Sequence, residues 1–400
     1  MIRTTVWLLT SVALAQSLPS GISPQRLNRL REQMKADVDG QAIPGAVLLM
    51  VRNGKVAQEV FGFQDRRKQM PMSAGSIFRI ASMTKPIVSV AAMILAEEGK
   101  LDIGAPVAKY LPEFSAVRVG PGGEVPKRPM TVQDLLRHTS GLTYGIFGNS
   151  PVDQLYRKAD LFASPSLKAM VTKLASLPLL HQPGEVWEYS VSTDVLGRVV
   201  EVASGMDLDR FIAARITGPL KMPDTGFFLT AAQMKRLALP DAPMAMPPAD
   251  LTVRPGFLSG GGGMLSTASD YGRFCQMLLG GGEFDGMRIL APHSVALMAA
   301  DQLPPNAERH TPVGMSLGAF GPTPEMGTSF GLGFAVRTEA GRNPVPGSAG
   351  DFSWSGITGT YFWVDPQEKL IAVLMTQLPQ AAITTYWRRV RTLVYQTLTN

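Results

Sequence analysis

The sequence predicts an α+β protein in which an antiparallel sheet is flanked by helices and carries an inserted, mostly helical lobe. Two β-hairpin patterns lie near opposite ends of the chain, and a helical pattern accompanies each of them. Between them, residues 106–255 show helical patterns broken by proline and glycine. The chain has 400 residues, of which 45% are hydrophobic, enough for one large core or two coupled lobes. We therefore expect the two ends of the chain to build one sheet with helices packed on it.

The first helix and hairpin follow from the spacing of apolar residues. Residues 22–38 place Leu27, Leu30 and Met34 on one side of a helix. The next segment, "PGAVLLMVRNGKVAQEVFGFQD", consists of two apolar runs joined by Asn53-Gly54. Asn-Gly is the strongest short hairpin signal because both residues accept the positive φ angles of a tight turn.

The other end of the chain repeats this arrangement. The segment "GTYFWVDPQEKLIAVLMTQ" predicts a second hairpin that turns at Asp365-Pro366. A final helix is expected from about Gln380 to the end of the chain. Residues 22–105 together with 256–400 are therefore assigned to the α/β lobe.

The mostly helical lobe spans residues 106–255. One of its helices is predicted to begin at Thr131, because Asp134 follows at the spacing of a capping box. Another is expected to follow Ser192 or Thr193 in "STDVLGRVVEVASG".

The first residues, "MIRTTVWLLTSVALAQS", are typical of a secretory signal peptide. Arg3 precedes a short apolar run that ends in Ala13-Leu14-Ala15. We expect residues 1–15 to be removed before Gln16 and the protein to be periplasmic or secreted. The alternative is an uncleaved extension on a cytoplasmic protein. The run is too short for a transmembrane helix, and no later stretch reaches ~18 uncharged apolar residues, so no membrane span is expected.

Composition and motifs argue against several classes of binding protein. The net charge is +6, but the basic residues are scattered and no nucleic-acid-binding module is present. The glycine run at residues 259–263 lacks the pattern of a phosphate-binding loop. We expect it to let the backbone pass close to the active cleft, before a helix capped by Ser266 or Thr267. The histidines lie far apart and form no zinc-binding pattern: His138, His181, His293 and His310. No nucleic acid, metal or cofactor is therefore expected, and nothing in the sequence indicates an oligomeric state.

The segment "RIASMTKPIVSVAAMILAEEGKLDI", residues 79–103, supplies the first candidate for catalysis. Its apolar residues predict a helix that runs from Pro86 to an end at Gly99. Pro86 has no N–H and must lie in the first turn, so the helix begins near Ser82. Lys85 lies one turn further on, which places its ammonium beside the Ser82 hydroxyl. A solvated surface lysine is the alternative interpretation of this S-x-x-K spacing.

A second serine, Ser316, lies in "GMSLG" and matches the nucleophile-elbow pattern G-x-S-x-G. That architecture needs a histidine after the serine, and all four histidines precede Ser316. The flanking Pro312 and "GPTP" are also unsuited to the strand and helix that an elbow requires. We therefore favour Ser82 as the nucleophile.

Two further segments complete the pattern around Ser82. "EYSVSTDVLG" contains Tyr189, and "FSWSGITGTYFWV" contains Trp354-Ser355-Gly356, where an edge strand beside the substrate is expected. Together with "LLRHTSGL" these segments resemble the β-lactamase-like serine hydrolases, which include class C β-lactamases and D-alanyl-D-alanine peptidases. The resemblance covers the chain from about residue 22 and is strongest to the family VIII carboxylesterases. It implies the β-lactamase/D-Ala peptidase-like fold.

The resemblance also implies an acyl-enzyme mechanism that needs no cofactor. Ser82 attacks the carbonyl, and Lys85 and Tyr189 move the protons, with either of them as the general base. Burial and the positive end of its own helix both disfavour a charged Lys85, which suits a base. The backbone N–H groups of Ser82 and Ile357 would form the oxyanion hole.

Two departures distinguish the chain from class C β-lactamases. Val191 stands where Tyr-x-Asn has its asparagine, and Trp354 stands where Lys-Thr-Gly has its lysine. A tryptophan there is typical of the family's esterases, so we expect a carboxylesterase for short-acyl, small-molecule esters that contact Trp354, Ser355 and Gly356. The alternatives are a β-lactamase, D-alanyl-D-alanine peptidase or acyltransferase, and a penicillin-binding-like receptor without turnover. His138 is expected to hold a loop rather than take part in catalysis.

Overall fold

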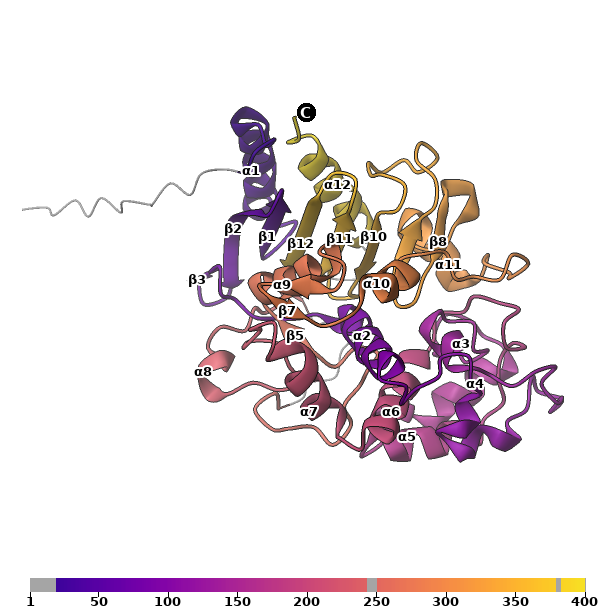
Figure 1. The fold of residues 1–400 in the computed structure, drawn as a ribbon. Helices are drawn as coiled ribbons and strands as arrows, with labels where there is room; N and C mark the ends of the chain where they lie inside the picture. The colour runs from indigo at the N-terminus through magenta and orange to yellow at the C-terminus, as the bar shows by residue number, and fades with distance from the viewer. Residues whose placement is uncertain (1–18, 243–249, 379–382, 400) are drawn as a thin grey trace, which may run out of the picture.

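The main sheet of the protein joins the two ends of the chain (Figure 1). The computed structural model describes residues 19–242, 250–378 and 383–399, so the predicted signal peptide over residues 1–15 lies outside the described residues. Within them the sheet is antiparallel and has eight strands in the order β3-β2-β1-β12-β11-β10-β9-β8. In that order their bounds are Met70–Pro71, Lys55–Asp65, Gly45–Arg52, Leu370–Thr376, Tyr361–Asp365, Phe352–Ser355, Ala335–Arg337 and Thr328–Phe330.

Both predicted hairpins are present and lie side by side in the sheet. β1 pairs with β2 across Asn53 and Gly54, whose φ angles of 51° and 75° are those of a tight hairpin turn. β11 pairs with β12 after a turn at residues 366–369. β1 also pairs with β12 in one continuous register, from Ala46 opposite Thr376 to Arg52 opposite Leu370. The expectation that both chain ends build one sheet is confirmed.

Helices cover both faces of the sheet because its central strands are apolar on both sides. Alternate residues of β1 (Ala46, Leu48, Met50) share a buried cluster with α1 (Pro24–Asp39) and α12 (Ile383–Tyr395). The intervening residues of β1 face the opposite cluster, which includes α9 (Ala268–Leu279) and α2 (Thr84–Glu97). Figure 1 shows α1 and α12 along the outer face, with α9 and α2 on the other.

The predicted terminal helices occupy the outer face. Leu27, Leu30 and Met34 are fully buried, as their spacing predicts. Burying such a side chain contributes about 1.5–3 kcal/mol, so α1 is held by packing more than by its own helix propensity. The predicted helix start at Gln380 lies outside the described residues, and α12 is described from Ile383.

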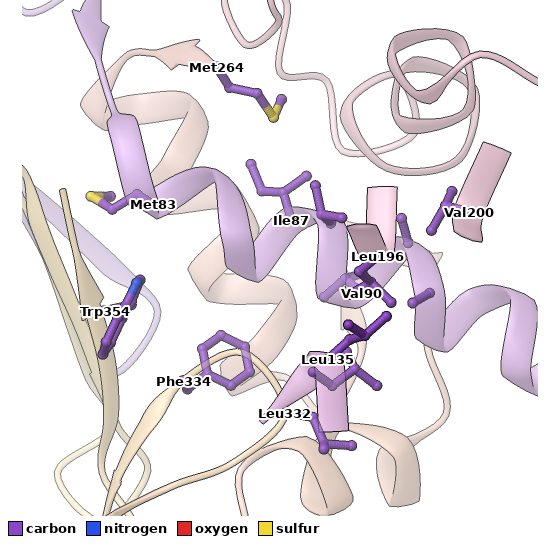
Figure 2. Close-up of a cluster of buried hydrophobic side chains, with 14 of the residues drawn as sticks. Met83, Ile87, Val90, Leu135, Leu196, Val200, Met264, Leu332, Phe334 and Trp354 are labelled. Atoms are coloured by element: carbon purple, nitrogen blue, oxygen red, sulfur yellow. The ribbon is translucent and has the colours of Figure 1, made fainter. Parts of the chain in front are cut away.

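A mostly helical region extends below the sheet and packs on α2. Its helices are α3 (Val132–Leu136), α4 (Pro151–Ala159), α5 (Leu167–Leu174), α6 (Ser192–Ser204), α7 (Leu208–Ile212) and α8 (Ala231–Met234). Figure 2 shows Val90 of α2 beside Leu135 of α3 and Leu196 of α6. The same hydrophobic cluster continues through α2 to the sheet. Lobe boundaries at residues 105 and 255 remain predictions.

Two helix starts in this region were predicted, and one needs correction. Thr131 caps α3, and Asp134 completes the capping box. α6 begins at Ser192 with Val191 as its N-cap, so neither Ser192 nor Thr193 precedes the helix. The Ser192 hydroxyl is used elsewhere: it lies 2.7 Å from the hydroxyls of both Ser140 and Ser190.

The remaining elements are short. They are α10 (Pro292–Met298), α11 (Pro312–Leu317), the ribbon of β4 (Phe78–Arg79) with β5 (Leu265–Ser266), and the ribbon of β6 (Glu283–Phe284) with β7 (Met287–Arg288). Within the described part of the chain, no helix combines the length and apolar character needed to cross a membrane.

Candidate active site

Ser82 lies in a tight turn that leads into α2. A 3₁₀ turn over Ala81–Met83 precedes the helix, and Pro86 falls in the first helical turn, as predicted. Ala81 has a φ of 44°, a left-handed conformation that costs an L-residue roughly 1–2 kcal/mol. Strained backbone of this kind often marks a functional position. Lys85 follows one turn later, and its Nζ lies 3.4 Å from the Ser82 Oγ.

Lys85 is buried rather than solvated. Lys85 is only 1% exposed, so the alternative that it is a solvated surface lysine is wrong. The Nζ donates hydrogen bonds to the Gly261 carbonyl at 2.7 Å and to the Tyr144 hydroxyl at 3.0 Å. Together with the Ser82 Oγ, these two groups give the Lys85 Nζ three oxygen neighbours. A neutral amine has two N–H donors and one lone pair, so the same arrangement also lets Lys85 accept a proton from Ser82.

Tyr189 lies beside Lys85, but its ring, and not its hydroxyl, faces the lysine. The Lys85 Nζ faces the Tyr189 ring at 4.5 Å from its centroid. Within the described residues, the buried Tyr189 hydroxyl has no hydrogen-bond partner. The ring is held between His138 and Trp354, with centroids 4.8 Å and 5.3 Å away. The structure thus brings Tyr189 to the site without the hydrogen bond to Lys85 that a proton relay in the resting state would use.

The hydrogen bond to Lys85 comes instead from Tyr144, which sequence reasoning missed. Tyr144 follows the "HTSGL" loop, six residues after His138. Burial raises the pKa of its hydroxyl well above the usual value, and nearby Tyr189 and Asp194 add to that effect. Tyr144 is therefore held neutral and can donate to or accept from Lys85. The sequence signal that could have indicated Tyr144 is its position directly after the loop that His138 was expected to hold.

Asp194 is the second residue that sequence reasoning missed. It lies on α6, and its Oδ1 accepts hydrogen bonds from the Ser259 hydroxyl at 2.7 Å and the Gly261 N–H at 3.0 Å. Its Oδ2 is buried and has no hydrogen-bond partner within the described residues. Burial raises the pKa of this carboxyl, while Ser259 and the charge of Lys85 oppose the rise. Asp194 thus positions the glycine loop that carries one of the Lys85 acceptors.

The glycine run lies against the site, as predicted. A Cβ on Gly260 would meet the Thr193 carbonyl at 2.5 Å, and one on Gly261 would meet the Asp194 Oδ2 at 2.4 Å. Side chains are excluded there because the backbone passes so close to α6. Thr267 caps the following helix, α9, as one of the two predicted alternatives.

The Trp354-Ser355-Gly356 element requires a correction. β10 lies inside the sheet and is not an edge strand. However, β9 pairs only with Phe352 and Ser353, so the last two residues of β10 pair with β11 alone. Trp354, Ser355 and the following Ile357 line a cavity at this end.

Gly356 is not among the residues that line this cavity. A Cβ there would approach the Ile80 carbonyl and the Thr360 Oγ1 to 2.4 Å. The glycine therefore allows the turn after β10 to pack against the segment that leads into Ser82. Its contact with substrate stays a prediction.

The cavity has a volume of about 630 Å³ and opens over Ser82. Its walls are mostly aromatic and aliphatic, contributed by Phe147, Phe162, Phe227, Leu251, Phe257, Val313, Leu317, Trp354, Ile383 and Trp387, among others. Such a lining suits an uncharged organic group with few polar contacts. Among the described residues, no group of three His, Cys, Asp or Glu side chains is arranged to hold a metal ion.

Ser316 also lines the cavity, but its surroundings are not those of a nucleophile elbow. It lies within helix α11, and its hydroxyl donates to the Val313 carbonyl at 2.8 Å. This hydrogen bond to the carbonyl of the preceding helical turn engages the proton that a base would need to remove.

His138 is fully buried with a φ of 59°, and its Nδ1 accepts a 3.4 Å hydrogen bond from the Ser190 N–H. Burial lowers its pKa well below the usual value, and the charge of Lys85 adds to this.

The chain is similar to known proteins over most of its length. Residues 30–395 match the family described as Beta-lactamase. Protein Rv1367c of Mycobacterium tuberculosis is 37% identical over 358 residues, which cover 85% of this chain and 87% of that protein. Esterase EstB of Burkholderia gladioli is 30% identical over 390 residues, covering 90% and 92%. The solved structure of EstCE1, a hydrolase with promiscuous acyltransferase activity, has a TM-score of 0.78 and 28% identity, covering 92% of this chain and 98% of its own.

Proposed function

The chain belongs to the beta-lactamase family of serine hydrolases, and on that premise we propose that it is a carboxylesterase that hydrolyses short-acyl esters. The observation that carries the proposal is the 3.4 Å contact between the Ser82 Oγ and the buried Lys85 Nζ beneath an apolar cavity. A nucleophile with a base in hydrogen-bond reach is the signature of covalent catalysis. The relationship to EstB and EstCE1 supports esters as the substrate class.

In the proposed reaction, Lys85 takes the proton of the Ser82 hydroxyl as its oxygen attacks the ester carbonyl. The resulting oxyanion is held by the backbone N–H groups of Ser82 and Ile357. When the tetrahedral intermediate collapses, the C–O bond to the alcohol breaks and the leaving oxygen takes a proton. Tyr144 is hydrogen-bonded to Lys85 and can pass that proton on, and Tyr189, whose ring lies beside Lys85, is the second candidate for this step. Water then attacks the acyl-enzyme, and the same groups act in reverse order to release the acid.

Two neighbours of Lys85 support its role as the base. The Gly261 carbonyl and the Tyr144 hydroxyl fix the direction of the side chain, so its third position points at Ser82. Preorganised geometry of this kind saves the entropy of assembling the reacting groups.

An acyltransferase is the second candidate, because the cavity is apolar and EstCE1 is described as having promiscuous acyltransferase activity. In that case an alcohol replaces water in the second step. A β-lactamase or D-alanyl-D-alanine peptidase would use the same Ser82. A penicillin-binding-like receptor would stop at the acyl-enzyme.

Turnover of p-nitrophenyl butyrate tests the proposal. The purified protein should release p-nitrophenol continuously, and the Ser82→Ala variant should not. A single burst equal to the enzyme concentration would instead identify the receptor. Adding a primary alcohol and measuring butyrate ester formation by chromatography would separate the acyltransferase from the esterase.

We also propose that the protein is periplasmic or secreted, which rests on the N-terminal sequence alone. N-terminal sequencing of the protein purified from its native cells should begin at Gln16. A protein that retains Met1 or its neighbours would contradict export by a cleaved signal peptide.

A further inference from the structure

The cavity above Ser82 contains an arginine whose charge no acidic side chain meets. Arg79 lines the cavity and lies three residues before Ser82. Within residues 19–242, 250–378 and 383–399, its guanidinium has no hydrogen-bond or ion-pair partner. The segments outside these ranges contain no aspartate or glutamate. A ligand is therefore the available source of a carboxylate for this arginine.

Leaving Arg79 without a counter-ion has a cost. Arg79 is partly buried, and this burial lowers the pKa of the guanidinium with no described carboxylate acting against it. A guanidinium presents five N–H donors in a fixed fork that matches a carboxylate. Most arginines in the structure are paired: Arg236 with Asp224 and Arg254 with Asp209 are examples.

The backbone around Arg79 is fixed in place. Its carbonyl accepts hydrogen bonds from the Thr358 Oγ1 at 2.8 Å and the Gln377 Nε2 at 3.1 Å. In the β4–β5 ribbon it also lies opposite Leu265. The arginine is thus presented to the cavity from a rigid frame, which keeps low the entropy lost on binding.

The distance to the nucleophile suits a small substrate. Three residues span at most about 11 Å between the Cα atoms of Arg79 and Ser82. One molecule can therefore place its ester carbonyl at Ser82 and an anionic group at Arg79. The other charged residue that lines the cavity, among those the structure describes, is Asp250, whose carboxylate is exposed and accepts from the Thr252 N–H and hydroxyl.

Exposed apolar side chains extend from the cavity to its rim. Ile146, Phe162 and Val253 line it and are 63%, 49% and 60% exposed. Exposed apolar side chains around a pocket mark a surface that a hydrophobic ligand covers. The cavity thus combines a long apolar wall with Arg79, a cation that has no carboxylate partner among the described residues.

We propose that Arg79 binds a carboxylate of the substrate, and that the substrates are esters with a carboxylate and an apolar body. This inference rests on the proposed esterase function and narrows its substrate class. The carboxylate lies in the acyl part or the alcohol part, and a matched pair of substrates for each position distinguishes them.

The test compares carboxylate esters with neutral carboxamides of the same shape. The acyl-side pair is the mono-4-nitrophenyl ester of adipic acid and the corresponding adipamic ester. The alcohol-side pair is 3-carboxy-4-nitrophenyl butyrate and its 3-carbamoyl analogue. For each pair the measured quantity is the ratio of kcat/KM for carboxylate over carboxamide. A charge-assisted hydrogen bond is worth ~1.5–3 kcal/mol, so Arg79→Gln should lower at least one ratio by roughly ten- to 150-fold.

Arg29→Gln is the matched control, because Arg29 is an exposed arginine on α1 and its loss changes the net charge equally. It should leave both ratios within about twofold of wild type, since an exposed charge far from the substrate is screened. Arg79→Lys keeps the charge without the fork and should give an intermediate ratio. The inference is overturned if Arg79→Gln changes neither ratio or slows both members of each pair equally.

The inference and the proposed function fail in different ways. If the wild-type protein hydrolyses none of the four esters, the esterase proposal fails, and calorimetric binding still tests Arg79. The probes are then N-(3-carboxyphenyl)butyramide and its carboxamide analogue. The wild-type protein should bind the carboxylate probe at least about tenfold tighter than the carboxamide probe. The Arg79→Gln variant should bind the two probes with similar affinity. Equal affinities for wild type would overturn the inference.

Discussion

The Lys85 Nζ lies over the ring of Tyr189, 4.5 Å from its centroid, and makes no hydrogen bond to the Tyr189 hydroxyl. The tyrosine that does bond Lys85 is Tyr144, at 3.0 Å. Two tyrosines therefore share the surroundings of one base. They differ in what they touch: Tyr144 hydrogen-bonds the lysine, whereas the buried Tyr189 hydroxyl has no hydrogen-bond partner among the described residues.

Substitution of each tyrosine should separate these roles. Tyr144→Phe removes a hydrogen bond to a charged group worth ~1.5–3 kcal/mol, and is expected to lower kcat/KM for p-nitrophenyl butyrate by roughly ten- to 150-fold. Tyr189→Phe removes a positioned proton donor, which is typically worth ~10²–10⁴ in rate. A Tyr189→Phe variant with nearly wild-type kcat, beside an inactive Tyr144→Phe, would transfer the proton relay to Tyr144.

Lys85 and Tyr189 are expected to act as a unit. Lys85→Ala alone should lose at least ~10²-fold in kcat, because it removes the amine that contacts the Ser82 hydroxyl. Adding Tyr189→Phe should then cost much less than it does in the wild type, since residues of one proton-transfer unit are not additive. Steady-state kinetics of the two single variants and the double variant give the coupling. Losses that multiply would argue for independent roles.

Ser82 and Ser316 both line the cavity, so activity must decide between them. Ser82→Ala should abolish nearly all hydrolysis of p-nitrophenyl butyrate, because the nucleophile is lost. Ser316→Ala should keep a large part of it, since its hydroxyl is engaged with the Val313 carbonyl inside α11. Mass spectrometry after a fluorophosphonate probe should place the label on Ser82. An inactive but folded Ser316→Ala protein would contradict the assignment.

Asp134 should make the stability of the protein depend on pH. Its burial alone would raise the pKa, but hydrogen bonds from Arg128 and from the Thr131 N–H, and a further one from Arg137, lower it to about 2. Because the folded pKa lies below the unfolded value, the stabilisation is present above pH ~4 and is lost as the pH falls toward 2. A shift of this size corresponds to about 2 kcal/mol at neutral pH.

Asp134→Asn should therefore lower the free energy of unfolding at pH 6 by at least about 2 kcal/mol, and more where the two arginines are left uncompensated. The difference from wild type should shrink by about 1 kcal/mol between pH 6 and pH 3. Urea unfolding of both proteins at pH 6 and pH 3 measures this difference in the free energy of unfolding. Asp39→Asn, at the exposed end of α1, serves as the control and should change stability by less than about 0.5 kcal/mol. A constant difference at both pH values would show that Asp134 does not titrate as described.

Local patterns in the sequence predicted much of this fold. The Asn53-Gly54 turn, the Thr131–Asp134 capping box and the Ser82–Lys85 spacing each depend on neighbours within a few residues. The structure confirms all three geometries. Their physical causes, a positive φ, an N-terminal cap and the helical repeat, are local.

The parts that could not be predicted depend on contacts between distant segments. Tyr144 reaches Lys85 across 59 positions and Asp194 reaches Gly261 across 67, and neither spacing leaves a local pattern. The Ser192 hydroxyl was expected at a helix cap, but it lies 2.7 Å from the hydroxyl of the distant Ser140 and equally close to that of Ser190. Such tertiary contacts override local propensity.

Trp354 determines the preference between esters and β-lactams that we expect. A β-lactam has a carboxylate beside its reactive carbonyl, and the lysine of a Lys-Thr-Gly element can meet it with a charge-assisted hydrogen bond. Here the indole of Trp354 is 3% exposed and packs against Tyr189 and Phe330, with centroids 5.3 Å and 5.1 Å away. An apolar wall replaces the charge at this position.

The protein is therefore expected to hydrolyse p-nitrophenyl butyrate with a much higher kcat/KM than a first-generation cephalosporin. Loss of the lysine contact alone accounts for roughly ten- to 150-fold, the equivalent of ~1.5–3 kcal/mol. Some cephalosporin turnover should remain, because the Ser355 hydroxyl still lines the cavity and Arg79 offers a charge from another wall. The remaining cephalosporin turnover should be lower still in the Arg79→Gln variant. The hydrolysis rates of the ester and of the cephalosporin are measured by absorbance on the same preparation. Equal or higher efficiency on the cephalosporin would contradict the esterase proposal and favour a β-lactamase, because it would mean that the missing Lys-Thr-Gly lysine costs this site nothing on a β-lactam.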